Sequence, residues 1–476
     1  MTAEPTERLL SGWGRTNPSR AQVVLPDGPD GVAQLLGSGG TGEPMAASPR
    51  SAMPGDAVGG GPLIARGLGR SYGDAAQCAG GTVIETARLD AIGPIDPRVG
   101  TVEVGGGASL GELMRRALLT GWFVPVTPGT RHVTVGGAIA ADVHGKNHHR
   151  DGSFCRYVTN LTLVTPTGTH VVGSDQDAAL FWATAGGMGL TGVVTNATLQ
   201  LIPVESAWML VDTARFDRLD ELMAVMSASD TDHRYSVAWL DVAGRRGDRG
   251  RSVLTRGEHA PLDTLPPALR GRRPAGHGDR SVRPPTWTAG RLLTPGLVRT
   301  MNGLWFRKAP RRETGALRTA SSFFHPLDGV AGWNLLYGKR GFVQYQFVVG
   351  ARHAHLVHDV IGLTGTYKVP CFLAVLKRLG PGDPGPLSFP AEGWTLALDF
   401  PVGPDRLWAL LDRFDELVAA AGGRVYLAKD SRLRPELFAV MYPRSGELAD
   451  VRDRVDPRRR LQSDLSRRLG LDRRCL

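Results

Sequence analysis

The chain has 476 residues, of which 42% are hydrophobic and 21% charged, and its formal net charge at pH 7 is +10. This length exceeds the ~100–200 residues of one ordinary domain, so we expect two packed domains. No apolar run approaches the ~18 residues that cross a bilayer, and the sequence opens without the apolar segment of a secretory signal, so the expected compartment is the cytoplasm.

The first part of the chain alternates short strand-like runs with two amphipathic helices. The expected elements are strands at 82–85, 101–104, 161–165 and 193–201, and helices at 110–119 and 178–184. Residues 35–61 are rich in Gly, Ala, Ser and Pro, a composition typical of flexible loops. We therefore interpret this segment as a flexible insertion.

Beyond residue 205, apolar and polar residues alternate along short runs. The clearest runs are 235–241, 341–349, 372–377 and 394–400. Such alternation is typical of strands in an antiparallel sheet whose two faces differ. We expect a second domain built on this sheet, with helices covering one face and the other face free for a substrate.

A strongly basic stretch interrupts this second region. Residues 245–318 contain 17 Lys and Arg against five Asp and Glu, an excess of 12 that is larger than the net charge of the whole chain. The stretch is also rich in Pro and Gly, so we expect much of it to be mobile. It is either a solvated insertion or a basic face beside an anionic membrane. No aromatic–basic recognition module accompanies the charge, so no nucleic-acid partner is expected.

Metal and disulfide chemistry are not indicated. The four cysteines lie far apart and include no C-x-x-C pair. His144, His148 and His149 have no Asp, Glu or Cys partner at the spacing of metal ligands. We expect reduced thiols and no metal site.

Two glycine-rich segments carry the strongest functional signal. Residues 127–149, TPGTRHVTVGGAIAADVHGKNHH, end in three histidines, and residues 65–75, ARGLGRSYGDA, combine two arginines with three glycines. Glycine lets backbone N–H groups approach a ligand closely, and arginine matches phosphate oxygens. Together the segments favour a large anionic cofactor held mainly by main-chain groups. VGGAIA alone fits equally well with a tight turn between two strands.

Residues 187–192, GMGLTG, fit the pattern G-x-G-x-x-G letter for letter. A dinucleotide-binding Rossmann motif needs a strand before the glycines and a helix after them. Here the expected helix 178–184 comes first and the expected strand 193–201 follows. We therefore reject this segment as a Rossmann site.

The glycine-rich motifs resemble those of the vanillyl-alcohol-oxidase-like flavoproteins. They are most similar to the decaprenylphosphoryl-β-D-ribose 2′-oxidases, the flavin half of the epimerase that makes the arabinose donor of actinobacterial cell walls. The similarity extends from GWGRTNPSRA at 12–21 to SDLSRRL at 463–469, and HGKNHH at 144–149 is its most specific part. Further matching pieces are VAWLD (237–241), FFHPLD (323–328), FVQYQFV (342–348), LSFPAEGW (387–394) and YLAKDSR (426–432).

The resemblance implies an α+β fold of two domains. Residues 1–206 would form a PCMH-type FAD-binding domain, and residues 207–422 would form the substrate-binding domain on the antiparallel sheet. Residues 423–476 would return to the FAD-binding domain.

The resemblance also implies which residues contact FAD. They are Ala65, Arg66, Gly67, Leu68, Gly69, Arg70, Ser71, Tyr72, Gly73, Asp74, Gly129, Thr134, Val135, Gly136, Gly137, Ala141, Asp142, Val143, His144, Val194 and Tyr426. Related aldonolactone and alditol oxidases carry a flavin-linking histidine where this chain has Arg70. We therefore expect FAD to be bound noncovalently.

Lys429 and His144 are the expected catalytic residues. In similar proteins the AKDSR segment places this lysine beside flavin and substrate, where it would hydrogen-bond a hydroxyl or act as a base if burial lowers its pKa. Without the resemblance, a surface lysine paired with Asp430 would be the simpler interpretation. Histidine suits proton transfer near neutral pH. The resemblance puts His144 against the flavin ring, where orienting the cofactor is an equally good role.

The resemblance places the substrate contacts on the second domain. They are Trp239, Phe324, Gln344, Gln346, Lys377, Thr395 and Ala397. Lys377 would meet the phosphate as a point charge, and Gln344 would bond sugar hydroxyls. The mycobacterial members have Tyr, Asn and Cys where this chain has Phe324, Thr395 and Ala397. Without a thiol at Ala397, the covalent cysteine-directed inhibitors of the family are not expected to bond here.

The expected reaction is FAD-dependent oxidation of the ribose 2′-hydroxyl of decaprenylphosphoryl-β-D-ribose to a ketone. A separate NADH-dependent reductase would complete the epimerisation, a membrane quinone would re-oxidise the flavin, and the cytoplasmic protein would attach peripherally to a membrane. The first alternative is a soluble sugar-lactone or alditol oxidase of the same fold that uses oxygen. The second is a flavin-binding partner protein without turnover of its own.

Overall fold

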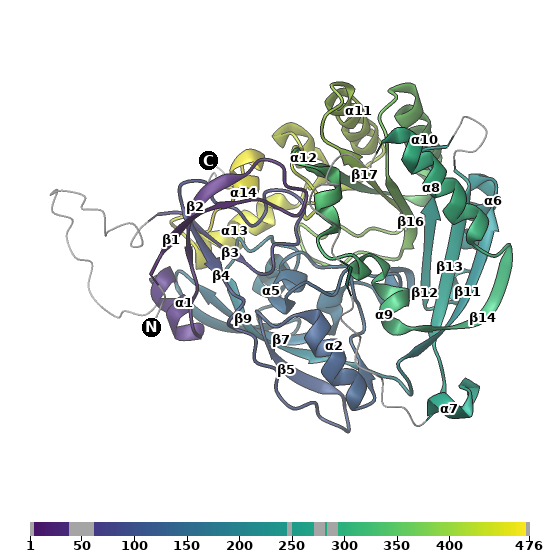
Figure 1. The fold of residues 1–476 in the computed structure, drawn as a ribbon. Coiled ribbons are helices and arrows are strands. Elements are labelled where there is room, and N and C mark those ends of the chain that lie inside the picture. The colour runs from purple at the N-terminus through teal and green to yellow at the C-terminus, as the bar shows by residue number, and fades with distance from the viewer. Residues whose placement is uncertain (1–3, 38–60, 245–249, 271–280, 283–293, 473–476) are drawn as a thin grey trace, which may run out of the picture.

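The computed structural model describes residues 4–37, 61–244, 250–270, 281–282 and 294–472. Figure 1 shows two groups of strands side by side, purple and blue in the N-terminal part and teal to green in the part that follows. The described strands form two four-stranded sheets, one eight-stranded sheet and one two-stranded ribbon. Separate, mostly antiparallel sheets with helices packed on them confirm the expected α+β fold.

The first sheet has the strand order β1-β2-β4-β3. Its elements are β1 (Thr6–Leu10), β2 (Ser19–Val24), α1 (Pro29–Leu36), β3 (Leu63–Arg66) and β4 (Thr82–Glu85). β4 runs parallel to β2 and β3, and its Val83 and Ile84 are fully buried, as parallel strands covered on both faces require. The strand predicted at 82–85 is confirmed, and the glycine-rich loop 67–74 begins where β3 ends.

The second sheet is antiparallel, with the order β5-β9-β7-β8. The elements of this region are β5 (Thr101–Gly105), α2 (Leu110–Leu119), β6 (Trp122–Phe123), α3 (Val135–Ala140), α4 (His148–Asp151), β7 (Val158–Thr165), β8 (Gly168–Gly173), α5 (Ala178–Thr184), β9 (Val193–Gln200) and β10 (Ile202–Pro203). α2 begins where the Ser109 hydroxyl accepts a hydrogen bond from Glu112 N–H. Both predicted helices are confirmed, and the three predicted strands are right to within three residues.

The large sheet has the order β14-β11-β13-β12-β16-β17-β15-β18. Its strands are β11 (Trp208–Phe216), β12 (Tyr235–Leu240), β13 (Ser252–His259), β14 (Arg312–Thr319), β15 (Phe342–Val349), β16 (Leu373–Leu379), β17 (Gly393–Pro401) and β18 (Arg424–Val425). The helices of this region include α6 (Leu219–Ser229), α10 (His355–Thr366) and α11 (Arg406–Ala420), and α9 (Ala320–Phe324) follows β14. All its pairings are antiparallel, α6 packs on β11 and β13, and α11 packs on β15. The expected antiparallel sheet is confirmed, but helices are not confined to one face. α6 and α11 cover one face, and α9 packs on the other, where its Phe323 and Phe324 contact Tyr235 of β12.

Two further sequence-based expectations are corrected by the structure. Residues 35 and 36, which we assigned to a flexible insertion, are the last residues of α1, and both leucines are buried; residues 38–60 lie outside the described part. The basic stretch 245–318, which we expected to be largely mobile, contains β13, β14, α7 (Pro267–Arg270) and α8 (Pro295–Lys308). β13 pairs with both β11 and β12, so ladder hydrogen bonds outweigh the local composition. The remaining parts, 245–249, 271–280 and 283–293, lie outside the described residues.

The C-terminal segment lies against the first sheet, where Figure 1 shows yellow helices beside purple strands. Its helices are α12 (Pro435–Met441), α13 (Ser445–Val455) and α14 (Asp464–Leu469). Leu461 forms a bridge with Leu63, and Arg468 pairs with Asp74 at 2.9 Å. These contacts agree with a return of the chain to its N-terminal part, while the domain boundaries at 206 and 422 stay a prediction.

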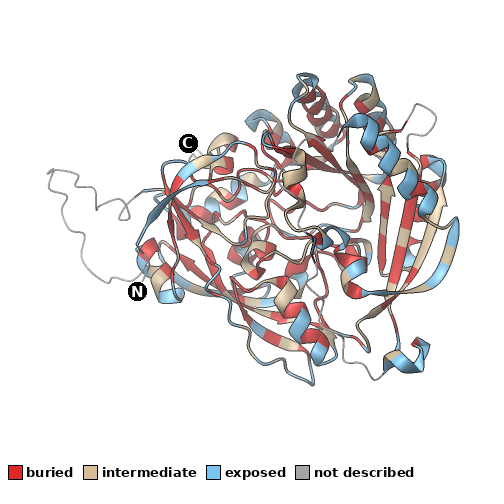
Figure 2. Ribbon diagram, in the orientation of Figure 1, coloured by how far each residue is buried: buried red, intermediate tan, exposed pale blue. Residues whose placement is uncertain are grey.

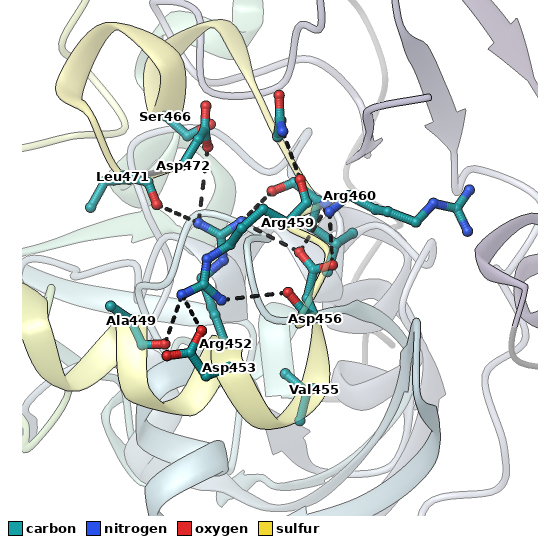
Figure 3. Close-up of polar contacts among 12 residues, drawn as sticks. Ala449, Arg452, Asp453, Val455, Asp456, Arg459, Arg460, Ser466, Leu471 and Asp472 are labelled. Carbon is teal, nitrogen blue, oxygen red and sulfur yellow. Dashed lines mark hydrogen bonds and ion pairs between the residues drawn. The ribbon is translucent and has the colours of Figure 1, made fainter. Parts of the chain in front are cut away.

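A buried guanidinium stabilises this segment (Figure 3). Arg452 donates to the carbonyl oxygens of Leu461 at 2.6 Å and Leu471 at 2.7 Å, and it lies 3.4 Å from the Asp456 carboxylate. These contacts engage both terminal nitrogens of the guanidinium and place a counter-charge near it, which offsets part of the cost of burying the charge. Across the part of the chain that the structure describes, no helix is long and apolar enough to cross a membrane.

We expect two buried histidines, His148 and His259, to contribute less to the stability of the fold as the pH falls from 7 to 5. His148 accepts a hydrogen bond from Gly380 N–H and His259 contacts the Tyr235 hydroxyl, and burial lowers the pKa of each histidine to about 3. The unfolded chain, with a histidine pKa of about 6.5, binds protons that the folded chain excludes. This contribution is therefore complete above pH 6.5 and falls below it, by about 2 kcal/mol per histidine at pH 5. Urea unfolding at both pH values measures the loss.

A matched pair of variants isolates one histidine. His259→Gln should reduce the pH-dependent loss by about 2 kcal/mol because one titrating group is gone. His355→Gln, at an exposed histidine, should leave the loss unchanged. Equal effects of the two substitutions would contradict the assignment.

Candidate active site

A cavity of about 300 Å³ lies between the N-terminal sheets and the large sheet. Most residues that the sequence predicts for the site line it: Ala65, Gly67, Leu68, Gly69, Arg70, Ser71, Tyr72, Gly129, Thr134, Gly136, Gly137, Ala141, Val143, His144, Val194, Gln344, Gln346, Lys377, Ala397, Tyr426 and Lys429. Segments from both ends of the chain and from the middle therefore meet around one space.

The glycine-rich loop 67–74 crosses the C-terminal segment at close range. Tyr72 N–H donates to the Ala428 carbonyl at 2.9 Å. A Cβ on Gly73 would lie 1.8 Å from the Asp430 carbonyl oxygen, far inside van der Waals contact. Glycine at this position lets the two backbones touch, and that contact brings the loop and the AKDSR segment to the same wall of the cavity.

The VGGAIA segment folds as helix α3, so the interpretation of it as a tight turn between two strands is wrong. Thr134 caps the helix, its hydroxyl accepting a hydrogen bond from Gly137 N–H at 3.1 Å, and Gly136 N–H donates to the Gly106 carbonyl at 2.7 Å. In the preceding loop, a Cβ on Gly129 would meet no atom within 4 Å. Gly129 therefore leaves its part of the cavity wall free of a side chain, while the N–H groups of Gly136 and Gly137 are bonded within the fold and hold α3 at the wall.

Three adjacent strands bring substrate-binding candidates to one face of the large sheet. In the ladder Gln346 pairs with Ala397, Ala397 with Val375, and Lys377 with Thr395. Directly opposed residues point to the same side of a sheet. The intervening residues point to α11, where two of their rings contact Phe414. The face turned away from α11 is therefore a wall of the cavity.

Lys429 lines the cavity and does not pair with Asp430, whose carboxylate binds Arg468 at 2.8 Å. The Lys429 Nζ lies 3.7 Å from the centre of the Tyr72 ring. Burial lowers the pKa of Lys429, the buried Asp399 carboxylate opposes that shift, and Lys377 adds to it. Lys429 is therefore neutral at a lower pH in this site than it would be in water, and a carboxylate lies near it.

His144 is held as a neutral ring. Burial lowers its pKa well below the ordinary value, and Lys377 adds to the shift. The Gln346 amide donates to His144 Nε2 at 2.9 Å, and its other N–H meets Thr395 Oγ1 at 3.1 Å. The ring proton therefore lies on Nδ1, a buried atom without a partner among the described residues. A buried donor without an acceptor is costly, so this atom marks the place of an acceptor on a bound group.

Some predicted site residues do not line the cavity. They are Arg66, Gly73, Asp74, Val135, Asp142, Trp239, Phe324 and Thr395. Phe324 departs furthest from the prediction, because it is 2% exposed and packs against Phe123 at 5.3 Å and Tyr235 at 4.8 Å. We correct its assignment from substrate contact to aromatic core. Trp239 pairs with Val375 and so shares the cavity face, but it lies one strand beyond the lining residues.

Other lining residues were missed by the sequence analysis. An apolar group comprises Trp13, Leu327, Trp333, Leu373 and Val375, and a second group comprises Met188, Gly189 and Gly192. The second group belongs to GMGLTG, where α5 precedes the glycines and β9 follows them, so the rejection of a Rossmann motif is confirmed. Glycines directly before a buried strand were nevertheless a usable signal for close approach to a ligand.

Comparisons with known proteins agree with this geometry. Residues 59–174 match the FAD binding domain family. A decaprenylphosphoryl-β-D-ribose oxidase of Mycolicibacterium smegmatis is 40% identical over 472 residues, which cover 98% of each chain. This chain belongs to the decaprenylphosphoryl-β-D-ribose oxidase family.

Two other proteins are similar to this chain over a smaller part of its length. An uncharacterized protein of Streptomyces coelicolor is 44% identical over 372 residues, covering 76% of this chain and all of that protein. Cytokinin dehydrogenase 7 of Oryza sativa subsp. japonica is 28% identical over 241 residues, covering 48% of this chain and 43% of that protein.

As a member of the decaprenylphosphoryl-β-D-ribose oxidase family, the chain is an FAD-dependent oxidoreductase. The cavity fits that cofactor, since glycines line its walls and two buried donors of the lining, His144 Nδ1 and Arg70 Nε, have no partner among the residues that the structure describes. The residues that would hold FAD are those of 67–72, 129–137 and 141–144 that line the cavity, with Val194 and Tyr426.

Unfolding the holoenzyme should release its FAD. Arg70, at the position of the flavin-linking histidine of related oxidases, has its guanidinium 3.9 Å from the centre of the Trp13 ring. A guanidinium stays protonated in proteins and offers no nucleophilic lone pair to a flavin. The measurement is flavin absorbance in the filtrate after acid denaturation and ultrafiltration. Flavin retained with the polypeptide would contradict noncovalent binding.

Proposed function

We propose that this chain oxidises the 2′-hydroxyl of a polyprenyl-phosphoryl ribose, decaprenylphosphoryl-β-D-ribose, to a ketone. The observation that carries the proposal is the amine of Lys429, set against Tyr72 and near Asp399 in a cavity that also holds Lys377. Oxidation of an alcohol needs an acceptor for the hydroxyl proton and an acceptor for the hydride. When bound, FAD supplies the hydride acceptor.

Lys429 is the proposed proton acceptor. Its lowered pKa favours the neutral amine, whose lone pair takes the hydroxyl proton. The ammonium that forms is stabilised by Asp399, a fully buried carboxylate bonded by Gln344 at 2.5 Å and by the Tyr337 hydroxyl at 3.3 Å. The Tyr72 ring beneath Nζ also favours the charged form. The chain thus provides both the base and the groups that support its charge after transfer.

Lys377 and His144 position the reactants. Burial lowers the pKa of Lys377 to about 8, which leaves its amine mostly protonated at pH 7 and able to bind a phosphate anion. His144 is neutral and offers its Nδ1–H as a donor, which favours orientation of the bound group over proton transfer. Ala397 lines the cavity, so the covalent cysteine-directed inhibitors of the family have no thiol to bond at this position.

The proposal extends to three partners. The 2′-ketone must be reduced on the opposite face to give the arabinose form, which is the reaction of an NADH-dependent reductase. A membrane quinone re-oxidises the flavin, and the protein attaches peripherally to the membrane that holds the lipid-linked substrate. The basic stretch 245–318 supports this attachment through its charge.

A soluble sugar-lactone or alditol oxidase that uses oxygen is the alternative. The apolar cavity residues Trp13, Trp333 and Leu373 favour a lipid-linked substrate over a free sugar, because hydrocarbon gains from leaving water and sugar hydroxyls do not. A flavin-binding partner without turnover is disfavoured by Lys429, whose surroundings suit proton transfer.

Anaerobic reduction of the flavin tests the proposal. The holoenzyme is mixed with polyprenyl-phosphoryl ribose, with free pentoses and with alditols, and the visible flavin absorbance is followed. Bleaching by the lipid-linked ribose alone, reversed by a quinone and hardly by air, is the expected result. Bleaching by a free sugar with rapid recovery in air would replace the proposal with the soluble oxidase. No bleaching by any of these compounds would favour the partner protein.

A further inference from the structure

Helix α8 presents an apolar stripe to solvent. The side chains of the stripe and their exposed fractions are Leu297, 38%; Met301, 54%; Leu304, 60%; and Trp305, 58%. Their spacing of i, i+4, i+7 and i+8 puts them on one face of the helix. Figure 2 shows α8 mostly in pale blue on the outside of the molecule. Large apolar side chains gathered on an outward face mark an interaction surface more often than chance exposure.

The opposite face of α8 is anchored to the large sheet. Phe306 is buried, with the guanidinium groups of Arg215 and Arg251 about 5 Å from its ring centre. Asn302 donates to the Asp241 carboxylate at 2.9 Å. Because these contacts fix the rotation of the helix about its axis, the stripe is held outward by the fold.

The segment that contains α8 is basic. Residues 294–312 carry five basic residues and no acidic one. The basic residues are Arg299, Arg307, Lys308, Arg311 and Arg312. Lys308 follows Leu304 by four residues, so it extends the stripe at its C-terminal end. An apolar face joined to a cationic end is the pattern of helices that lie in the interface of an anionic membrane.

We propose that α8 is the membrane-docking element of this protein: its stripe enters the acyl-chain boundary while the basic residues at its end bind anionic lipid headgroups. The inference rests on the proposed function in one respect, because a polyprenyl-linked substrate resides in a bilayer. A second copy of the chain fits the surface less well, since a two-fold interface through α8 would bring like charges together. A bilayer accepts the stripe and neutralises the charge at once.

Vesicle binding tests the proposal without any substrate. The holoenzyme is sedimented with vesicles of phosphatidylcholine alone and of phosphatidylcholine with phosphatidylglycerol. We expect binding to the anionic vesicles, and a loss of at least about tenfold in the double variant Leu304→Ser, Trp305→Ser, because the apolar insertion is gone. Trp408→Ser, at a tryptophan on α11 that is 42% exposed, is the matched control and should bind as the parent does.

Charge is tested separately from apolarity. The double variant Arg307→Glu, Lys308→Glu should lose binding to anionic vesicles, and 0.5 M salt should weaken the parent in the same way, because headgroup attraction is screened. Both α8 variants should keep their thermal unfolding temperature, since the altered side chains are exposed.

Several outcomes would overturn the proposal. Unchanged vesicle binding by the Leu304→Ser, Trp305→Ser variant would exclude α8 as the docking element, as would a parent that binds no vesicles. A parent that is dimeric in solution and becomes monomeric in this variant would assign the stripe to a contact between copies. Failure of the proposed function can be told apart from failure of the docking proposal. In that case a short-chain, water-soluble phosphoryl ribose would not bleach the flavin, while vesicle binding would persist.

Discussion

Lys429→Ala should keep its FAD and lose reduction by substrate by about 10³-fold. A positioned general base contributes about 10²–10⁴-fold to the rate, and this amine is the cavity group with the environment of a base. The Nζ lies over the Tyr72 ring and near Asp399, which stabilise the ammonium formed by proton transfer. The substitution removes that ammonium together with the base. Stopped-flow bleaching of the flavin at saturating substrate, with flavin content measured on the same sample, gives both quantities.

Two further substitutions separate proton transfer from charge. Lys429→Arg keeps a cation at this position, but arginine stays protonated near neutral pH and cannot accept a proton. The variant should therefore be about as slow as Lys429→Ala. Lys339→Ala, at an exposed lysine, is the control and should reduce its flavin at the parental rate. Restored bleaching in Lys429→Arg would assign the residue to charge stabilisation, and near-normal bleaching in Lys429→Ala would remove it from the reaction.

Gly73→Ala should destabilise the protein by about 3 kcal/mol and lower its FAD content. Overpacking costs about 1–3 kcal/mol, and the upper end applies because the new Cβ would lie 1.8 Å from a backbone oxygen, that of Asp430, which cannot rotate away. Relief of the clash must separate the 67–74 loop from the segment that carries Lys429. Urea unfolding and the flavin-to-protein absorbance ratio after gel filtration measure the two effects.

Gly446→Ala provides the matched control. This glycine lies in α13, where an added Cβ meets no atom within 4 Å, so alanine should be neutral or stabilising by about 0.5–1 kcal/mol. A Gly73→Ala protein that retains parental stability and flavin content would show that the two backbones separate without cost, and would contradict the role given to their contact.

Local patterns predicted the elements whose partners are nearby or whose periodicity is strong. The helices at 110–119 and 178–184 have the predicted bounds because apolar spacing and a side-chain cap act within one segment. The same local view misjudged the basic stretch, where β13 is stabilised by strands on both sides of it. It also left VGGAIA open between a tight turn and a cofactor-binding segment, because the helix that this segment forms depends on the Thr134 cap and on packing of α3 against β9.

The candidate site was predicted mainly through the motifs that the chain shares with its family. Many residues in those motifs were found even when their side chains alone gave little signal. Trp13 and Leu327 were missed although they lie in the shared motifs GWGRTNPSRA and FFHPLD, and Trp333 lies outside those motifs. All three are apolar, and nothing in a single sequence distinguishes an apolar residue of a cavity wall from one of the core. Phe324 lies in a shared motif and was therefore assigned to the substrate. Its actual place in an aromatic core depends on Phe123, about two hundred positions earlier in the chain.

The sequence by itself determined which residues share a strand face. Alternation along β15 puts Gln344 and Gln346 on one side, because side chains of a strand point alternately to its two faces. Only the tertiary structure decided which faces meet. The antiparallel register of β15, β16 and β17 sets Gln346, Ala397 and Val375 in a row, and the contact at Gly73 brings the Lys429 segment beside them. Such pairings join residues far apart in the chain, so they follow from packing of the whole molecule and not from any local pattern.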